Sequence, residues 1–221
     1  MATTESTTKR RRSTRETPEI RRKSLIQATM RSIAKYGYSG TTIEKICEEA
    51  QISRGLINHH FKTKEELINL SYKELCDEWE FQTHGMLLET YKEPEDKLRA
   101  MIRMSFSPML FKQEYLGIWV GFWSVIGKSP SLKKLNRTMY AQDREKYQQI
   151  FEEIAAKRGI EVNARLAAIS LIALTDGLWL EWCLDPKGFT PEEAETACVN
   201  FVERTFATAS PAAPALASAA A

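Results

Sequence analysis

One short stretch of the chain gathers small, polar and basic side chains of the kind that contact DNA. Arg54 comes first, and a guanidinium can bind the O6 and N7 atoms of guanine. Gly55 would allow a close backbone approach, and Leu56 could contact a thymine methyl group. Lys62 and Lys64 would neutralise phosphates beside the groove. With one upstream residue included, the predicted DNA contacts are Thr42, Ser53, Arg54, Gly55, Leu56, Asn58, His59, His60, Lys62 and Lys64.

The remaining members of this group have weaker or double interpretations. Thr42 would put a hydroxyl at a helix N-terminus, where a phosphate binds well, although a plain helix cap explains it too. Ser53 could cap the next helix and contact phosphate, and Asn58 could bind adenine or a phosphate. We expect His59 and His60 to contact phosphate or sugar rather than a metal, because adjacent helical side chains point about 100° apart.

Two short helices and a tight turn are predicted to position these side chains. Thr41 is expected to cap the first helix, with Glu44 completing a capping box, and Ser53 to begin the second. A second capping box, Thr63 to Glu66, begins a long third helix. The first helix has an apolar face at i, i+3, i+4 and i+7, formed by Ile43, Ile46, Cys47 and Ala50. This plan is typical of a helix-turn-helix that inserts its second helix into a DNA major groove.

A second group combines aromatic rings with one carboxylate. Trp119 and Trp123 lie four residues apart, and Trp179 lies three residues from both Asp176 and Trp182. Indoles with a nearby carboxylate suit a quaternary ammonium ligand, through cation–π contacts and charge. The alternative is a plain aromatic core, with Asp176 bonded to neighbouring backbone. The candidate ligand-binding residues are Trp119, Phe122, Trp123, Tyr140, Asp176, Trp179 and Trp182.

The rest of the chain is predicted to form helices that are separated by proline and glycine. Beyond the helix-turn-helix, the predicted helices cover residues 18–36, 64–91, 94–110, 114–126, 130–158, 162–184 and 191–206. We therefore predict an all-α protein of about nine helices, with no convincing strand, repeat or P-loop. Its predicted parts are a disordered basic arm (1–17), a helix-turn-helix domain (18–64), a helical ligand-binding and dimerisation domain (65–207) and a low-complexity tail (208–221).

Charge is distributed unevenly along the chain, whose formal net charge is +2. Residues 1–64 hold 14 Lys/Arg and 6 Asp/Glu, whereas the remaining residues hold 17 and 23. A basic first third on an acidic body is typical of a nucleic-acid reader with a second, non-binding domain. Within it, the run Lys9 to Arg12 could follow phosphates or enter a minor groove, or be a solvated tail.

Several functional classes have little support. No stretch approaches the roughly 18 apolar residues of a membrane span, and the N-terminus lacks a secretory core. The four cysteines (47, 76, 183 and 198) have no metal-binding spacing and are expected to be reduced thiols in a cytoplasmic protein. We see no catalytic motif, so we expect no enzyme activity, no cofactor and no metal.

The predicted head resembles the TetR family of transcriptional regulators across residues 19–67. The motifs that carry this resemblance are Thr42-Ile43-Glu44-Lys45-Ile46, Ala50, Ser53-Arg54-Gly55, His59, Phe61 and Lys62-x-Lys64-x-x-Leu67. His60 departs from the tyrosine usual at its position in the family. The resemblance implies an all-helical body, a homodimer formed through helices 162–184 and 190–206, a palindromic operator and release by a small ligand.

The body has a narrower resemblance, to the choline-responsive repressors of glycine betaine synthesis within that family. Asp176-Gly177-Leu178-Trp179-Leu180 and Trp119-x-x-Phe122-Trp123 carry it. It implies choline as the effector, with betaine aldehyde second. The rival interpretation is a TetR-type regulator of another pathway, with an unrelated hydrophobic or cationic ligand such as a lipophilic cation or an acyl compound.

Overall fold

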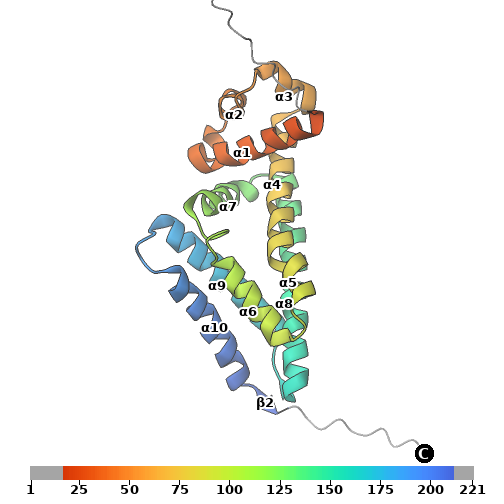
Figure 1. Ribbon diagram of the computed structural model, residues 1–221, viewed down its shortest axis with the longest axis vertical. Helices are drawn as coiled ribbons and strands as arrows, with labels where there is room; N and C mark the ends of the chain where they lie inside the picture. The colour runs from red at the N-terminus through yellow and green to blue at the C-terminus, as the bar shows by residue number, and fades with distance from the viewer. Residues whose placement is uncertain (1–16, 212–221) are drawn as a thin grey trace, which may run out of the picture.

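The computed structural model describes residues 17–211, and within them the chain is almost entirely helical (Figure 1). The molecule is elongated, with a small three-helix head at one end and a larger helical body below it. This confirms the all-α prediction. The proposed disordered arm lies almost wholly outside the described residues, and so does most of the proposed tail.

The head consists of α1 (Pro18–Gly40), α2 (Ile43–Ala50) and α3 (Arg54–His60). Proline begins α1, as expected of a residue that lacks an N–H donor. Gly37 interrupts its helical geometry with φ 67° and ψ 171°, and one further turn follows before α2. The predicted break at Gly37 is therefore confirmed, because positive φ favours glycine. The head core consists of Leu25, Ala28, Met30, Ile33, Ile46, Ile57 and Phe61.

A long helical run connects the head to the body. It comprises α4 (Lys64–Glu80), the π-helical turn η1 (Phe81–Gly85) and α5 (Met86–Thr90). The Thr63 hydroxyl accepts the Glu66 N–H at 3.0 Å, as predicted, but the Glu66 carboxylate accepts the Lys62 N–H at 2.8 Å instead of that of Thr63. The run descends from the head along the upper part of the body beside α8, which continues farther down (Figure 1).

The body is completed by α6 (Pro94–Ser105), α7 (Gln113–Ile126), α8 (Pro130–Arg158), α9 (Ala164–Leu184) and α10 (Pro191–Ala207). The bounds of α8 agree with the prediction, because Pro130 can start a helix and Gly159 ends it at φ 65°. The helix predicted to reach Leu110 instead ends at Ser105. Hydrogen-bonded turns over residues 106–112 connect it to α7. A two-residue antiparallel pairing of β1 (Ile160–Glu161) with β2 (Ser210–Pro211) was not predicted.

The helix α9 corrects the expectation that no stretch approaches the length and apolar composition of a membrane span. Its 21 residues include an 18-residue window with mean hydropathy 1.4, so by length and composition it could cross a membrane. In the structure it packs against α7, α8 and α10, and only 22% of that window is buried within the single chain. The apolar composition therefore reflects both a core-facing side and an uncovered one.

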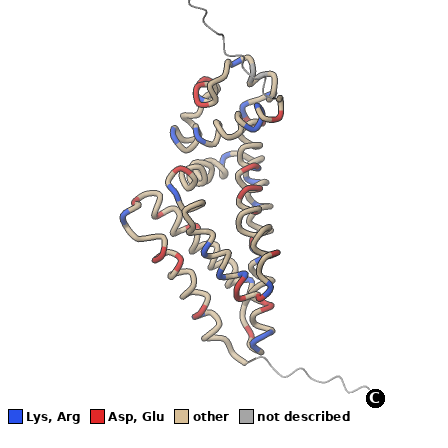
Figure 2. Tube along the Cα trace, in the orientation of Figure 1, with Lys and Arg blue, Asp and Glu red and all other residues tan. Residues whose placement is uncertain are grey.

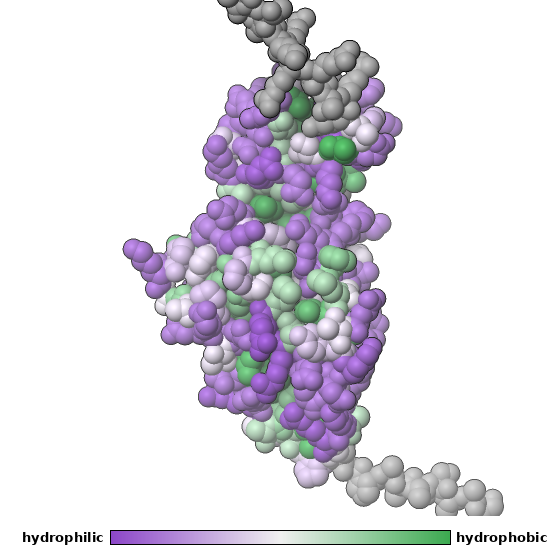
Figure 3. Space-filling model, in the orientation of Figure 1, coloured by the Kyte–Doolittle hydropathy of each residue, from purple (hydrophilic) through white to green (hydrophobic). Residues whose placement is uncertain are grey.

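Charged residues occur in both parts of the molecule. Figure 2 shows Lys and Arg positions, and Asp and Glu positions, in the head and along the body helices. On the face drawn in Figure 3, hydrophilic residues cover most of the head and the outer body, and hydrophobic residues gather between them. All four cysteines are free, and Cys47, Cys76 and Cys198 are buried, as expected.

Candidate functional site

The helix α3 has one buried side and one exposed side. Ile57 is 2% exposed and anchors α3 in the head core, while Arg54, Gly55 and His59 are exposed. Exposed small and basic residues on a short helix that projects from the head suit contact with a DNA groove. The side chains of Leu56 and Asn58, two predicted contacts on the same helix, lie outside the described part of the structure.

Arg54 is positioned by an ion pair across the helix-turn-helix. Its Nη1 lies 2.9 Å from Oε1 of Glu44, and both side chains are well exposed. The pKa of Glu44 is lowered, first by its own backbone N–H, then by the Thr42 hydroxyl and by Arg54. Exposed ion pairs contribute little stability, so the guanidinium can exchange this partner for a base or phosphate at little cost.

The capping box predicted at the N-terminus of α2 is wrong, because a different threonine caps the helix. Thr42 is the N-cap, and its exposed hydroxyl accepts the Lys45 N–H at 3.3 Å. Thr41 is fully buried and donates its hydroxyl hydrogen to the Gly37 carbonyl at 2.7 Å. Because Thr41 bonds backward into α1 and Glu44 pairs with Arg54, the box predicted from those residues does not form.

The two ends of α3 show further detail. Ser53 occupies the predicted N-cap position, but its exposed side chain makes no capping hydrogen bond. At the other end, Arg22 of α1 donates from Nη1 to the His60 carbonyl at 3.1 Å, and its guanidinium stacks 4.7 Å from the Phe61 ring centre. Sequence reasoning missed this role of Arg22, because no local pattern connects residues 38 positions apart.

His59 and the two lysines complete this surface. His59 is exposed and His60 is half-buried, with their ring centres 5.3 Å apart. Lys62 is exposed in the turn after α3, and Lys64 begins α4 with Nζ 5.7 Å from the Tyr38 ring centre. Polar groups at the helix ends of one small domain are thus contributed by Thr42, Ser53, Arg54 and these two lysines, and such groups are chemically suited to phosphate.

The second site is a cavity inside the body, where four helices meet. The volume of this cavity is about 30 Å³. Its walls are formed by Trp79 of α4, Trp119 and Trp123 of α7, Met139, Tyr140, Asp143 and Tyr147 of α8, and Ile172, Thr175, Asp176 and Trp179 of α9. Five of the seven predicted ligand residues therefore meet here, namely Trp119, Trp123, Tyr140, Asp176 and Trp179.

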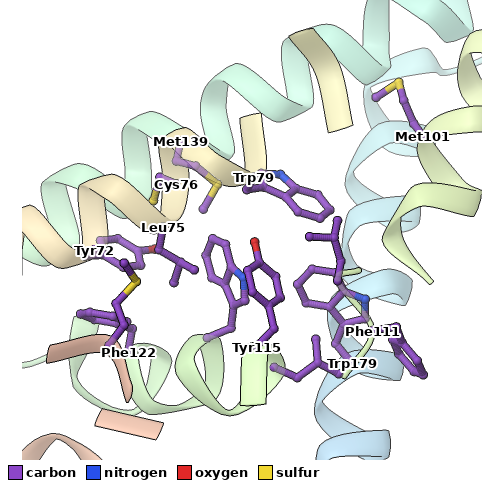
Figure 4. Packing of buried hydrophobic residues seen from close by; sticks show 14 of the residues in the cluster. Tyr72, Leu75, Cys76, Trp79, Met101, Phe111, Tyr115, Phe122, Met139 and Trp179 are labelled. Atoms are coloured by element: carbon purple, nitrogen blue, oxygen red, sulfur yellow. The ribbon is translucent and has the colours of Figure 1, made fainter. Parts of the chain in front are cut away.

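The indole rings make edge-to-face contacts around this cavity. The centres of the Trp79 and Trp179 rings lie 5.1 Å apart at 89°, and Trp119 lies 6.3 Å from Trp179. Figure 4 shows Trp79, Tyr115 and Trp179 directed toward one another from α4, α7 and α9. Several aromatic rings on different sides of a small space are the arrangement that cation–π recognition requires.

Two predicted ligand residues lie elsewhere. Phe122 is fully buried and packs 4.8 Å from Tyr72, in the core below α7. Trp182 packs on Phe111 with ring centres 4.5 Å apart. Neither residue lines this cavity, because each side chain points from its helix toward other neighbours.

Sequence reasoning also missed several walls. Trp79 is 40 residues or more from the other indoles in sequence, so only the packing of α4 brings it here. Asp143 and Tyr147 lie one and two turns beyond Tyr140 on α8. Their shared face with Tyr140, at i+3 and i+7, was a signal that could have identified them.

Asp176 is the central polar group of the cavity. Its Oδ2 accepts the Tyr140 hydroxyl hydrogen at 2.7 Å, and no Lys, Arg or His of the described chain forms a salt bridge with it. Burial raises the pKa of Asp176 to about 6, against the lowering effect of the Tyr140 bond, and nearby Asp143 raises it further. A half-buried carboxylate beside aromatic rings and without a protein cation favours a cationic ligand.

The indole N–H groups differ in how they are satisfied. Trp79 donates to Asp143 Oδ2 at 3.0 Å, and Trp179 donates to the Ser105 carbonyl at 3.1 Å. Trp119 and Trp123 have buried Nε1 atoms without a hydrogen-bond partner in the described structure. Burial raises the pKa of Tyr115, and its hydroxyl lies close enough to Trp119 for the indole to oppose this rise. Because buried donors are ordinarily paired, the N–H of Trp123 is the group available to an oxygen of a bound molecule.

A group of possible metal ligands lies next to the cavity and shares Asp143 with its lining. Glu80, His84 and Asp143 each offer one ligand atom, and these atoms lie within 4.8 Å of one another. The pKa of Glu80 is lowered to about 2, chiefly by its hydrogen bond to His84 and also by Lys146, while burial opposes the shift. Since the Lys146 ammonium contacts Glu80 and Trp79 donates to Asp143, both carboxylates already have partners.

The head contacts the body close to the cavity. α1 packs along α7, and Gly121 of α7 approaches so closely that a Cβ there would lie 2.6 Å from Cγ2 of Ile33. Gly121 lies between the cavity residues Trp119 and Trp123. A shift of α7 that widens the cavity must therefore also move a surface on which the head rests.

The chain is similar to known regulators over most of its length. Residues 94–207 match the sequence model of the BetI-type transcriptional repressor C-terminal domain, and residues 25–70 match that of the tetR family of bacterial regulatory proteins. An HTH-type transcriptional regulator BetI of Burkholderia lata is 35% identical over 167 residues, covering 75% of this chain and 84% of that protein.

Solved structures show the same fold. A candidate transcriptional regulator of Pseudomonas aeruginosa PAO1 superposes with a TM-score of 0.80 at 33% identity, covering 90% of this chain and 96% of that one. A candidate transcriptional regulator of Saccharomonospora viridis, solved in complex with choline, has a TM-score of 0.76 at 19% identity, covering 87% and 98%.

Proposed function

The chain belongs to the TetR family of bacterial transcriptional regulators, with the C-terminal domain of BetI-type repressors, and we propose that it leaves a palindromic DNA operator when a quaternary ammonium compound binds its aromatic cavity. Choline is the first candidate effector, and control of glycine betaine synthesis in the cytoplasm is the corresponding role. One observation carries the choice of ligand: Asp176, half-buried and without a protein cation, lines the cavity together with the indoles of Trp119, Trp123 and Trp179.

The DNA-binding part of the proposal concerns residues 18–64. Arg54, exposed and paired only with an exposed glutamate, is the proposed base reader of α3. Thr42 and Ser53 at helix N-termini, and Lys62 and Lys64 after α3, are the proposed phosphate contacts. Gly55, Leu56, Asn58, His59 and His60 complete the proposed contact surface.

The proposed dimer uses the uncovered side of α9, within the helical domain of residues 65–207. Leu166, Ile169, Leu180 and Leu184 are 56%, 38%, 40% and 75% exposed. Their spacing, with the exposed residues 173 and 177 between them, follows one helical stripe. A continuous apolar stripe on a soluble regulator is best explained by a second subunit, with α10 beside it.

Two heads related by a two-fold axis imply a palindromic operator. Half-sites would be separated by roughly 34–36 Å or a larger multiple of the helical repeat. If the effector favours a dimer whose heads are spaced differently, operator affinity and effector affinity fall reciprocally by the same factor. The proposed connections are α4, which runs from the head to Trp79, and the α1–α7 contact at Gly121.

The size of the cavity supports release by conformational change. A volume of about 30 Å³ holds little more than one or two water molecules. Ligand sites are ordinarily roughly 300–1,000 Å³, so a trimethylammonium group would have to widen the space. Since two walls belong to α7, widening would act on the helix that supports α1.

A titration of operator binding tests the proposal. In gel-shift assays, the protein is bound to DNA fragments from the promoter region of its own gene, with and without 1–10 mM choline. Tetramethylammonium and an uncharged isostere of choline, 3,3-dimethylbutanol, serve as matched probes. We expect choline to release the DNA and the uncharged isostere to have no effect. Release by the isostere but not by choline would favour the rival, a regulator of another pathway with a hydrophobic ligand.

A further inference from the structure

Building on the cation cavity proposed above, we infer that the site accepts choline but prefers a zwitterion, whose quaternary ammonium takes the place of choline and whose anionic end binds in a basic hollow directly outside that cavity. The hollow is lined by Lys133, Arg137 and Arg144 of α8. The chemical class is a quaternary ammonium joined by a short linker to a carboxylate or a phosphate.

The hollow and the inner cavity form one continuous site. The hollow has a volume of about 630 Å³ and is open to the surface of the single chain. Its α9 side includes Gly177 and Leu180, so it lies at the edge of the stripe proposed for the dimer. Trp123, Tyr140 and Asp176 line both spaces. A molecule that reaches Asp176 from solvent through the hollow therefore passes the three basic side chains.

One face of α8 carries the cations and the tyrosine together. Lys133, Arg137, Tyr140 and Arg144 follow each other at spacings of four, three and four residues, which is a single helical stripe. With a rise of about 1.5 Å per residue, Arg137 and Arg144 lie roughly 4–6 Å along the axis from Tyr140, one on each side. Tyr140 in turn holds Asp176 through its hydroxyl.

None of these three cations forms a salt bridge within residues 17–211, and Asp176 is the one acidic residue lining the hollow. Farther along α8 the pattern is different, since Lys146 contacts Glu80 and Lys157 lies near Glu93 and Glu95. Unneutralised cations around a concave surface raise the local positive potential and attract anions. The same potential opposes the entry of a ligand with only positive charge.

The two spaces thus have opposite charge preferences, which a ligand with both charges satisfies. The quaternary ammonium would lie among the indoles near Asp176. Its anionic oxygens would lie toward Arg137 and Arg144, since guanidinium groups bind carboxylate and phosphate in a bidentate way. The buried Nε1–H of Trp123, which has no acceptor and belongs to a residue lining both spaces, could donate to one of these oxygens.

Calorimetric titration of the full chain compares four probes: choline, (3-carboxypropyl)trimethylammonium, phosphocholine and inorganic phosphate. We expect one or both zwitterions to bind at least about tenfold more tightly than choline, with an advantage that shrinks as salt increases. The relative affinities of the carboxylate and phosphate probes identify which anion the hollow accepts.

A double variant, Arg137→Gln with Arg144→Gln, tests the role of the hollow. It is expected to abolish the preference for zwitterions while choline binds as well as before or better. Lys134→Gln is the matched control, because Lys134 is an exposed cation on the same helix that does not line the hollow.

Three results would overturn the inference. In the first, choline binds the natural chain at least as tightly as both zwitterions do. In the second, the preference for zwitterions survives in the double variant. The double variant could also change dimerisation with no effect on ligand preference, which would assign these cations to a subunit interface. If no quaternary ammonium probe binds at millimolar concentration, the proposed function itself fails, whereas choline binding without a zwitterion preference removes only this inference.

Discussion

Replacing Asp176 with asparagine separates the stability of the cavity from its ability to bind a cation. The substitution removes the charge and nearly preserves the shape and the contact with Tyr140. Burial raises the pKa of the Asp176 carboxyl from 3.8 to about 6. At pH 7 the group is ionised, and keeping it so in the folded state costs roughly 3 kcal/mol, because each pKa unit corresponds to about 1.4 kcal/mol.

The sign of the stability effect follows from this raised pKa. The folded state holds the Asp176 proton more tightly than the unfolded state does. The stability that the protein gains by having this carboxyl protonated is therefore fully present below about pH 4. It is lost as the pH rises through about 6. We therefore expect Asp176→Asn to raise the free energy of unfolding at pH 7 by up to roughly 3 kcal/mol, with the difference shrinking toward pH 4.

Ligand binding should change in the opposite direction. Loss of the carboxylate removes the charge partner of a cation and leaves the indoles, so choline affinity is expected to fall about tenfold to hundredfold, or about 1.4–2.7 kcal/mol. In the natural chain, affinity should also fall about tenfold per pH unit below pH 6, since the carboxylate becomes protonated. The asparagine variant should bind weakly and independently of pH.

Isothermal titration with choline at pH 5, 6, 7 and 8.5, together with urea unfolding at the same pH values, measures both effects. Tyr140→Phe is the matched control, because it removes the hydrogen bond to Asp176 while keeping the charge. It should therefore bind choline near the natural affinity above pH 8. An asparagine variant that binds choline normally at pH 7, or that loses binding together with stability, would refute this reasoning.

Four further substitutions test the other parts of the molecule. Arg54→Ala should weaken operator binding and sequence preference, whereas Lys64→Ala should weaken binding to operator and random DNA alike and lower the salt-dependence slope by about 1; gel-shift titrations at several salt concentrations distinguish them. Leu180→Glu puts a charge on the apolar stripe of α9 and should raise the dimer dissociation constant at least about tenfold, as measured by sedimentation. Gly121→Ala brings a Cβ to 2.6 Å from Ile33, which should lower the free energy of unfolding by about 1–3 kcal/mol and reduce the effect of choline on operator binding.

Each of these has a comparison in the same chain. Met109→Glu changes a side chain that is 51% exposed and outside α9, and it should leave the dimer intact. Gly117→Ala introduces a Cβ at an ordinary 3.7 Å from Ala34 and should be nearly neutral. Unchanged DNA affinity in both Arg54→Ala and Lys64→Ala would contradict the proposed DNA-binding surface, and equal effects of Gly117→Ala and Gly121→Ala would contradict the role of close packing at Ile33.

Most helices were predictable because their ends depend on local chemistry. Pro130 and Gly159 mark the bounds of α8, and Gly37 adopts the positive φ that its type allows. The two adjacent threonines before α2 show the limit of this approach. Either could cap the helix, and only the burial of Thr41 against the end of α1 leaves Thr42 as the cap.

The candidate sites divide in the same way. The DNA-contact residues lie within one short stretch, so spacing alone could group them. No local sequence pattern predicted that Arg22 holds the end of α3. The cavity draws on four helices. Its sequence neighbours Trp119, Phe122 and Trp123 separate in space, since Phe122 turns into the core toward Tyr72.

The sequence by itself determined the helices, the helix-turn-helix and the family, because these depend on interactions within a few turns and on short motifs. Tertiary structure alone decided which aromatic residues surround Asp176, how small the cavity is, and that cations of α8 lie outside it. It also brought Gly121 against Ile33, where the head rests on the body. The physical reason is that helix rotation and long-range packing set these contacts, and neither is encoded in the spacing of residues along one helix.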